Sequence, residues 1–235
     1  MALKWRVAGS SFSYLLRGFY MGCNQRNPSI LMNFCKMSGI SAEAQSVLDF
    51  WFEPGKELQD HFAVWFGGKS QDEIIKSKFS DLIEKARTGQ LKPWEEDPKS
   101  ALAHIILIDQ FCRNVHRGSP KSFDCDHVSL GIAKKLVENG RYKELNPMER
   151  FFSNLPFEHS ENMDDQDTAL KLYKELAADT KGTKYEGLGT SGVSYSQKHR
   201  EVIEKFGRFP KRNAVLGRTN TPEEEEILKN YPYNF

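Results

Sequence analysis

The chain has 235 residues, of which 39% are hydrophobic and 28% are charged, and its formal net charge is +1. A chain of this length can bury a substantial core, and the composition is that of a globular protein. No stretch approaches the roughly 20 consecutive apolar residues that a membrane-spanning helix needs, so we expect no membrane insertion.

The first 36 residues have a charge pattern of their own. They contain five basic residues and no acidic residue, which leaves 28 basic and 32 acidic groups in the other 199 residues. Four serines and an apolar side that includes Trp5, Leu15 and Phe19 complete the composition of an organellar transit peptide. We expect residues 1–36 to be a disordered basic arm that directs the protein to mitochondria. The alternatives are a plain tail on a cytoplasmic protein and an upstream extension ahead of translation from Met37.

From Ser41 onward the apolar residues are spaced as in helices, and no run of strict alternation indicates a β-strand. The pattern predicts an all-α domain over residues 41–235, a single helical bundle or solenoid of about nine helices. Pairs of helices joined by short turns resemble tetratricopeptide repeats, although no internal period near their roughly 34 residues is visible. The predicted helices span residues 41–53, 58–66, 71–88, 98–114, 124–139, 147–155, 163–179, 194–206 and 222–230.

Helix boundaries follow from capping residues and prolines. A capping residue precedes proline at Asp97-Pro98, Asn146-Pro147 and Thr221-Pro222, which is typical of helix starts. Pro156 is expected to end the helix before it. Residues 179–194 contain four glycines and no apolar period, so we expect a flexible loop there.

The first candidate site lies at the end of the apolar segment ALAHIILID, residues 101–109. Asp109 and Arg113 are four residues apart, as are Gln110 and Asn114, so these pairs form two adjacent polar strips on a helix. They are either an intrahelical ion pair with helix-end capping or the floor of a polar pocket.

The second candidate is the loop EKFGRFPKRNAVLGR, residues 204–218, which holds Arg208, Lys211, Arg212 and Arg218. Arginines in a loop stiffened by proline can bind carboxylate or phosphate, because the guanidinium group matches two oxygens at once. The alternative is a solvated basic loop. We expect no nucleic-acid partner, because the body is mildly acidic and shows no basic stripe interleaved with aromatic residues.

The third candidate is NLPFEHSENMDDQD, residues 154–167, where His159 stands among five carboxylates. Metal-ligand spacings such as His-Glu-x-x-His are absent, so we expect no metal site here. Asp164, Asp165 and Asp167 fit the first turn of the next helix, where the helix dipole favours acidic residues. His199 lies on an apolar stripe and is interpreted as a buried structural histidine.

Cofactor and nucleophile motifs are missing from the sequence. No dinucleotide fingerprint, phosphate-binding glycine loop or nucleophile elbow occurs, so we expect no cofactor. The four cysteines form no Cys-x-x-Cys pair and are too few for a disulfide scaffold, which predicts reduced thiols without a catalytic role.

Six ordered segments resemble the bacterial-type family catalogued as domain of unknown function 924. They are VLDFWFEPG, WFGGKSQDEIIKSKF, ALAHIILIDQFCRNVHRGSPKSFDCD, ERFFSNLPFEHSENMDDQD, KHREVIEKFGRFPKRNAVLGR and TPEEEEIL. The resemblance covers residues 46 to 235 and implies a tetratricopeptide-like helical fold, with no activity to carry over. Its motifs coincide with the three candidates. Cys112 replaces a proline usual in the family, and Lys211 replaces a frequent histidine.

We therefore expect the three segments to meet in one polar pocket that binds a small anionic molecule, and a hydrolase or a lyase would suit it. In this hypothesis the catalytic residues are His159, Glu161 and Asp109. The ligand-binding residues are Gln110, Arg113, Asn114, Arg208, Arg212 and Asn213.

The alternative is a helical-repeat interaction module without catalysis, in which the polar motifs serve only as scaffold. Such a module would bind a peptide or helix in an open groove lined by aromatic residues such as Trp51, Trp65 and Trp94. An enclosed cavity reached by the polar motif side chains would favour the enzyme.

Overall fold

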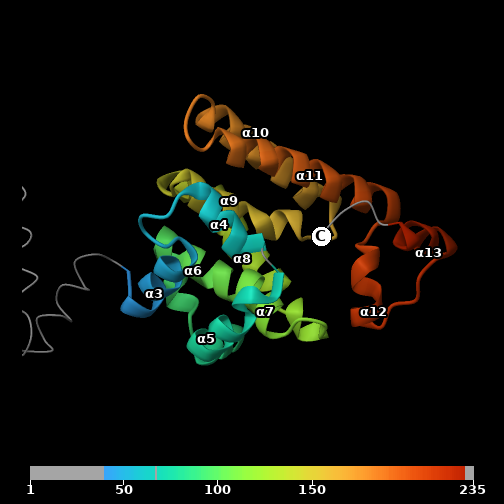
Figure 1. Ribbon diagram of the computed structural model, residues 1–235, viewed down its shortest axis with the longest axis horizontal. Coiled ribbons are helices and arrows are strands. Elements are labelled where there is room, and N and C mark those ends of the chain that lie inside the picture. Colours follow the sequence, from blue (N-terminus) through green and yellow to red (C-terminus); the bar gives the residue numbers. More distant parts are fainter. Residues whose placement is uncertain (1–39, 67, 231–235) are drawn as a thin grey trace, which may run out of the picture. The chain divides into compact units, whose positions relative to one another are not determined.

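The computed structural model describes residues 40–66 and 68–230, which belong to one compact unit. The predicted transit segment, residues 1–36, lies outside the described residues. Every regular element of the described part is helical, as the spacing of apolar residues predicts (Figure 1). Within these ranges, no helix combines the length and the apolar character needed to cross a membrane.

The α-helices are α3 (Ala42–Trp51), α4 (Leu58–Phe66), α5 (Asp72–Arg87), α6 (Pro98–Ile105), α7 (Cys112–Val115), α8 (Asp126–Glu138), α9 (Pro147–Glu158), α10 (Met163–Thr180), α11 (Glu186–Phe206), α12 (Asn213–Leu216) and α13 (Pro222–Lys229). Short 3₁₀ turns join them: η1 (Gly68–Gln71), η2 (Lys92–Glu96), η4 (Pro120–Ser122), η5 (Arg141–Glu144) and η6 (Pro210–Arg212).

The predicted helix starts at proline are confirmed. Asn146 accepts a hydrogen bond from the backbone of Glu149, whose carboxylate returns one to the backbone of Asn146. Thr221 and Glu224 form the same reciprocal capping box at α13. Each box satisfies two backbone donors that have no partner inside the helix, which is why the chain begins a helix at these points.

The segment predicted as one helix over residues 98–114 is continuous but contains a wide turn. Residues Ile106–Phe111 form a π-helix, η3, between α6 and α7. Such turns insert an extra residue into the helix and are frequent at functional sites. Here the wide turn carries Asp109, which is fully buried.

The prediction that Pro156 ends its helix was wrong. Pro156 lies inside α9, which continues to Glu158. Only one turn of helix is affected because the proline stands near the C-terminal end, and the buried ring packs inside the protein. The continuation places Glu158 and His159 at the helix end.

The prediction of a flexible loop over residues 179–194 was also wrong. Only residues 181–185 connect the two helices, because α10 runs to Thr180 and α11 begins at Glu186. A Cβ atom on Gly189 would lie 2.6 Å from the backbone Cα of Ala177, and one on Gly192 would lie 2.4 Å from the Tyr173 ring. These glycines therefore allow α10 and α11, which lie side by side in Figure 1, to pack closely.

The main core is rich in aromatic rings. The ring of Trp65 lies 4.6 Å from that of Phe152, and the ring of Trp51 lies 5.3 Å from that of Phe111. The indole of Trp65 also donates a hydrogen bond of 2.8 Å to the carbonyl of Trp51. Both tryptophans are buried. A smaller cluster of Val202, Ile203 and Phe209 anchors the chain that follows α11.

Candidate functional site

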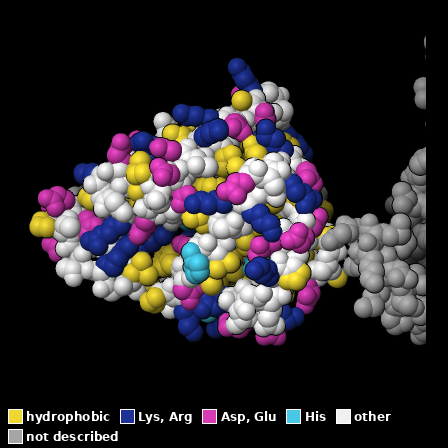
Figure 2. Space-filling view, turned by 180° about the vertical axis from the view of Figure 1, so that it is seen from behind, with side chains coloured by type: hydrophobic (Ala, Val, Ile, Leu, Met, Phe, Trp, Pro, Cys, Tyr) yellow, Lys and Arg dark blue, Asp and Glu magenta, His cyan; other side chains and the backbone are white. Residues whose placement is uncertain are grey.

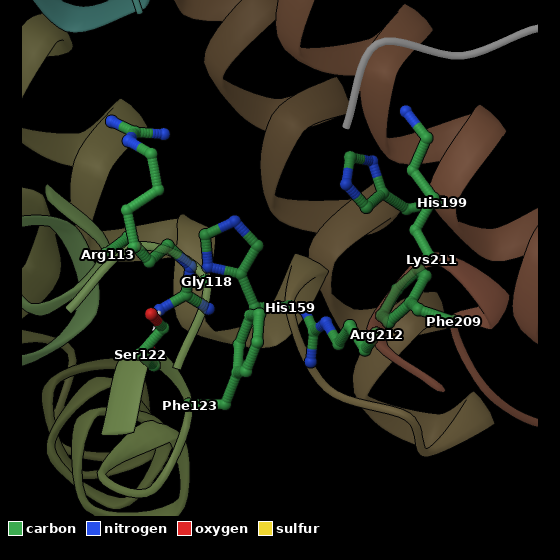
Figure 3. A pocket seen from close by; sticks show the side chains of 10 residues that line it. Arg113, Gly118, Ser122, Phe123, His159, His199, Phe209, Lys211 and Arg212 are labelled. Atoms are coloured by element: carbon green, nitrogen blue, oxygen red, sulfur yellow. Dashed lines mark hydrogen bonds between the residues drawn. The ribbon is translucent and has the colours of Figure 1, made fainter. Parts of the chain in front are cut away.

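A pocket of about 360 Å³ lies where segments distant in the sequence meet. It is lined by Arg113, Arg117, Gly118, Ser122, Phe123, His159, His199, Phe209, Lys211 and Arg212. Figure 3 shows that these side chains come from the end of α7, the turn around η4, the end of α9, helix α11 and the segment after it. All three predicted segments contribute to this wall.

The wall presents cations and histidines but no carboxylate. Four lining residues are arginine or lysine and two are histidine. Among the described residues, the acidic side chains that contact these groups stand behind the wall, at Asp72, Asp109, Asp126 and Glu158. The pocket therefore suits an anionic ligand.

His159 is held by the buried carboxylate of Asp109. The Nδ1 atom of His159 lies 2.8 Å from Oδ1 of Asp109, although the two residues are 50 positions apart in the chain. Burial alone would raise the pKa of Asp109, but attraction to His159 and Arg113, with a hydrogen bond from Gln110, holds that pKa below its ordinary value. Asp109 is thus ionised and can only accept hydrogen bonds.

The imidazole of His159 is therefore oriented as a base. Burial lowers the pKa of His159 more than the nearby Asp109 raises it, so the ring is neutral at pH 7. Because Asp109 accepts, the proton of the neutral ring resides on Nδ1, and Nε2 keeps its lone pair. A histidine in this arrangement can take a proton from water or from a ligand.

Arg113 and Arg212 share one carboxylate and one aromatic ring. Arg113 makes two contacts of 3.0 Å with Asp126 at the start of α8, and Arg212 lies 3.5 Å from the same carboxylate. The Arg212 guanidinium also stacks between Phe123 and Phe209, at 4.9 and 4.5 Å from the ring centroids. Burial lowers the pKa of Arg212 to about 10, so it stays charged at neutral pH. Two guanidinium groups are thereby fixed on the pocket wall.

His199 forms a second histidine–carboxyl pair beside the first. Its Nδ1 lies 2.9 Å from the carbonyl oxygen of Tyr195 and 3.3 Å from Oε1 of Glu158. The ring centroids of His159 and His199 are 6.3 Å apart. The prediction that His199 is buried holds, but the ring also lines the pocket, facing the side where His159 lies (Figure 3).

Three of the predicted site residues hold loops in place and do not line the pocket. Glu161 accepts hydrogen bonds from the backbone of Phe209 and from Arg218, at 2.7 to 3.0 Å. Arg208 pairs with Glu224 through two contacts of 2.6 and 2.7 Å. Asn213 bonds Asn220 and Glu224. Glu161, predicted as a catalytic residue, therefore positions the loop that carries Phe209 and does not line the pocket.

The two amides of the first candidate also support other groups. Gln110 donates to Asp109 at 2.6 Å, and Asn114 donates to Asp72 at 2.8 Å. Asp72 in turn holds Arg117, whose Nε lies 2.9 Å from Oδ2 of Asp72. These residues orient the pocket wall from behind.

The described thiols are poor nucleophiles. Burial raises the pKa of Cys112 to about 11 and that of Cys125 to about 12. Both are therefore protonated at neutral pH. Within the described residues, no group of three or more histidine, cysteine or acidic side chains is placed to hold a metal ion.

Comparison with known proteins agrees with the resemblance seen in the motifs. Residues 47–231 match the family described as bacterial protein of unknown function, DUF924. The chain belongs to the DUF924 family. No curated protein matches it. A solved structure of a protein of unknown function from Agrobacterium tumefaciens, ATU0120, is similar with a TM-score of 0.67 and 31% identity, over 80% of this chain and 97% of that one.

Several residues of this DUF924 pocket were not predicted. Asp126, Phe123 and Arg117 fall inside a segment that the resemblance covers, but no local pattern distinguishes them. Glu158 was seen as one of five carboxylates; Asp165 is buried as well, and what separates Glu158 from the others is its contact with His199. The signal available for His199 was its place on an apolar stripe, which indicates burial but not the identity of the neighbouring groups.

Proposed function

We propose that the pocket is an active site that binds a small anionic molecule and hydrolyses it, with His159 as the general base. The observation that carries this proposal is the contact of 2.8 Å between His159 and the buried Asp109, at a wall that also presents Arg113 and Arg212. Asp109 orients the imidazole, and the two arginines bind the anion beside it.

The distribution of charge favours a small ligand over nucleic acid. On the face shown in Figure 2, lysine and arginine side chains are interspersed with aspartate and glutamate. Nucleic acid selects a continuous basic surface, whereas the pocket gathers its cations around one cavity. The burial of Trp51 and Trp65 removes most of the aromatic groove on which the interaction-module alternative depended.

Binding is tested by thermal shift and titration calorimetry on the full chain, with inorganic phosphate and with citrate. At a ligand concentration about 100 times Kd, the free energy of unfolding should rise by about 2.7 kcal/mol. Arg212→Ala should abolish this shift. The matched control is Arg200→Ala, because Arg200 pairs with Asp167 and Glu204 and does not line the pocket. An unchanged shift in Arg212→Ala would contradict the proposal.

We also propose that residues 1–36 direct the protein to mitochondria, on the basis of their five basic residues and lack of acidic ones. Residues 1–36 fused to a fluorescent reporter should carry it into mitochondria. A second fusion with the five basic residues changed to glutamine should remain in the cytosol. A diffuse cytosolic signal from the unchanged fusion would reject the proposal.

A further inference from the structure

Arg212 is an arginine of the pocket wall whose charge is only partly balanced by the chain. Its side chain is 15% exposed, and within the described residues the carboxylate that it contacts is that of Asp126, 3.5 Å from Nη1. Asp126 is already held by Arg113 through two contacts of 3.0 Å. Of the two arginines that share Asp126, Arg212 therefore has the weaker contact.

The terminal nitrogens of Arg113 are used within the chain. Nη1 donates to the backbone carbonyl of Asp109 at 2.7 Å and to one oxygen of Asp126, and Nη2 donates to the other oxygen of Asp126. Nη2 also lies 3.5 Å from Oδ1 of Asp109. Arg113 can therefore attract an anion through its charge, while its two terminal nitrogens hold these two acidic residues.

One edge of the Arg212 guanidinium has no partner in the described part of the chain. Nη1 faces Asp126, whereas Nε and Nη2 take part in none of the hydrogen bonds among the described residues. A guanidinium group has five N–H donors, and a single contact of 3.5 Å leaves most of them unused. Because a charged group that has lost most of its hydration needs such bonds, this edge is suited to a ligand that accepts them.

The orientation of this edge is fixed by the surrounding residues. The guanidinium stacks between Phe123 and Phe209, at 4.9 and 4.5 Å from the ring centroids. In the turn η6, the backbone N–H of Arg212 donates to the carbonyl of Phe209 at 3.0 Å, and the N–H of Phe209 donates to Glu161. Arg212, Phe123 and His159 all belong to the pocket lining shown in Figure 3. A group held in this way loses little conformational freedom when a ligand binds.

Two other arginines of the chain show what such an edge binds. Arg208 holds the carboxylate of Glu224 with Nε and Nη2, at 2.6 and 2.7 Å. Arg117 holds Asp72 with the same two nitrogens, each at 2.9 Å. In this geometry two parallel N–H groups meet the two oxygens of one carboxylate. Arg212 has the same edge at the pocket and receives no carboxylate there from the described chain.

We propose that the ligand of this pocket is a carboxylic acid whose carboxylate binds the Nε and Nη2 edge of Arg212. This inference rests on the proposed function and names the class of molecule that the site takes. A carboxylate keeps both oxygens in one plane, which fits an edge stacked between two rings, whereas a tetrahedral phosphoryl group would place oxygens out of that plane, toward the rings. Because a carboxylate is not itself hydrolysed, the bond on which His159 acts lies elsewhere in the same molecule.

The first test measures the binding of citrate to the full-length protein by titration calorimetry. Arg212→Lys keeps the charge but loses the paired N–H groups, so the Kd for citrate should rise about tenfold or more. Arg200→Lys is the matched control, because Arg200 pairs with Asp167 and Glu204 outside the pocket, and it should leave the Kd unchanged. Equal Kd values for Arg212→Lys and Arg200→Lys would overturn the assignment of Arg212.

The hydrogen bond to this edge can be observed directly in proton–nitrogen correlation spectra of the arginine side chains. The Nε–H signal of Arg212 is the one that disappears in Arg212→Lys. On saturation with citrate this signal should move downfield and exchange more slowly with water, because a carboxylate accepts its proton. The Nε–H signal of Arg208, which already donates to Glu224, is the control and should not move. An Arg212 signal that stays in place while citrate binds would contradict the proposal.

A matched pair of small anions, titrated as competitors of citrate, separates the ligand classes. Acetate and methylphosphonate differ only in the anionic group, and at about pH 6 each carries about one negative charge. Acetate should bind more tightly. If methylphosphonate binds more tightly, the carboxylate class fails and the anion-binding pocket of the proposed function stands. If citrate, acetate and methylphosphonate all fail to bind the wild-type protein, both proposals fail.

Discussion

Glu158 and Glu224 are two buried carboxyl groups whose surroundings shift their pKa values in opposite directions. Burial raises the pKa of Glu158 beside the neutral imidazole of His199, and the negative charge of Asp109 raises it further, so its acid form is favoured. Glu224 accepts two hydrogen bonds from Arg208, so its ionised form is favoured. The same residue type therefore contributes to stability with opposite dependence on pH.

We expect Glu158 to make the wild type less stable, relative to Glu158→Gln, as pH rises from about 4.5 to about 8. Its pKa is raised in the folded state, so over this range the unfolded chain has released the proton that the folded chain retains. Urea unfolding of both proteins at several pH values measures this difference in free energy. A difference that does not change with pH would show that Glu158 is ionised in the folded protein.

Glu224 should show the opposite sign. Hydrogen bonds from Arg208 lower its pKa to about 2 from 4.5, so its stabilising contribution is present above pH 4.5 and is lost as pH falls toward 2. At pH 7, Glu224→Ala should cost about 2 kcal/mol, because charged hydrogen bonds and the capping box of α13 are lost. The cost should shrink in unfolding measurements near pH 3.

At the scale of the secondary-structure element, helices α10 and α11 form a closely packed hairpin. Gly189 and Gly192 stand on the face of α11 that meets α10, and the ring of Tyr173 fills the space above Gly192. Tyr173 is fixed in turn by a hydrogen bond of 3.0 Å from its hydroxyl to the carbonyl of Phe151. Because α11 carries His199, this packing also fixes one wall of the pocket.

Gly192→Ala should therefore destabilise the protein by about 1–3 kcal/mol. The added methyl group would overlap the ring of Tyr173, which its hydrogen bond to Phe151 holds in place. Gly187→Ala on the same helix is the control, since no atom lies within 4 Å of the position of its Cβ. Alanine there should stabilise the helix by about 0.5–1 kcal/mol. Melting temperatures of the two variants should move in opposite directions; a lower value for both would mean that α11 does not form over these residues.

At the scale of the whole molecule, the pocket is assembled by attaching residues 207–230 to the rest of the helices. Glu161 is the main link, because it binds Arg218 and the backbone of Phe209 together. The second link is Arg212, which reaches Asp126 and stacks on Phe123. Glu161 thus supports the site from outside the cavity.

Glu161→Ala should release this segment without unfolding the protein. Amide hydrogens of residues 207–230 should exchange faster, while those of α6 and α9 should keep their protection, because the main aromatic core is untouched. Binding of phosphate should weaken in parallel. Glu226→Ala removes an exposed pair with Lys229 and should leave exchange in residues 207–218 unchanged. Uniform loss of protection in Glu161→Ala would instead show that the segment folds together with the core.

The sequence by itself determined the features that depend on neighbours within a turn or two of helix. Capping boxes at Asn146 and Thr221, the apolar helix around residues 101–109 and the spacing of Asp109 from Arg113 are all of this kind. The family resemblance added which three segments carry the polar groups. Together these gave the all-helical class and three members of the pocket wall, His159, Arg113 and Arg212.

Only the tertiary structure decided how the polar groups pair and which face the cavity. Asp109 meets His159 from 50 residues away, and Glu158 is hidden beside His199 while Glu161, three residues later, turns to Arg218. Gly192 is a packing contact because Tyr173 lies against it. Burial and pairing of this kind arise from the packing of distant segments, and they set the protonation of each carboxyl group, which local sequence patterns do not encode.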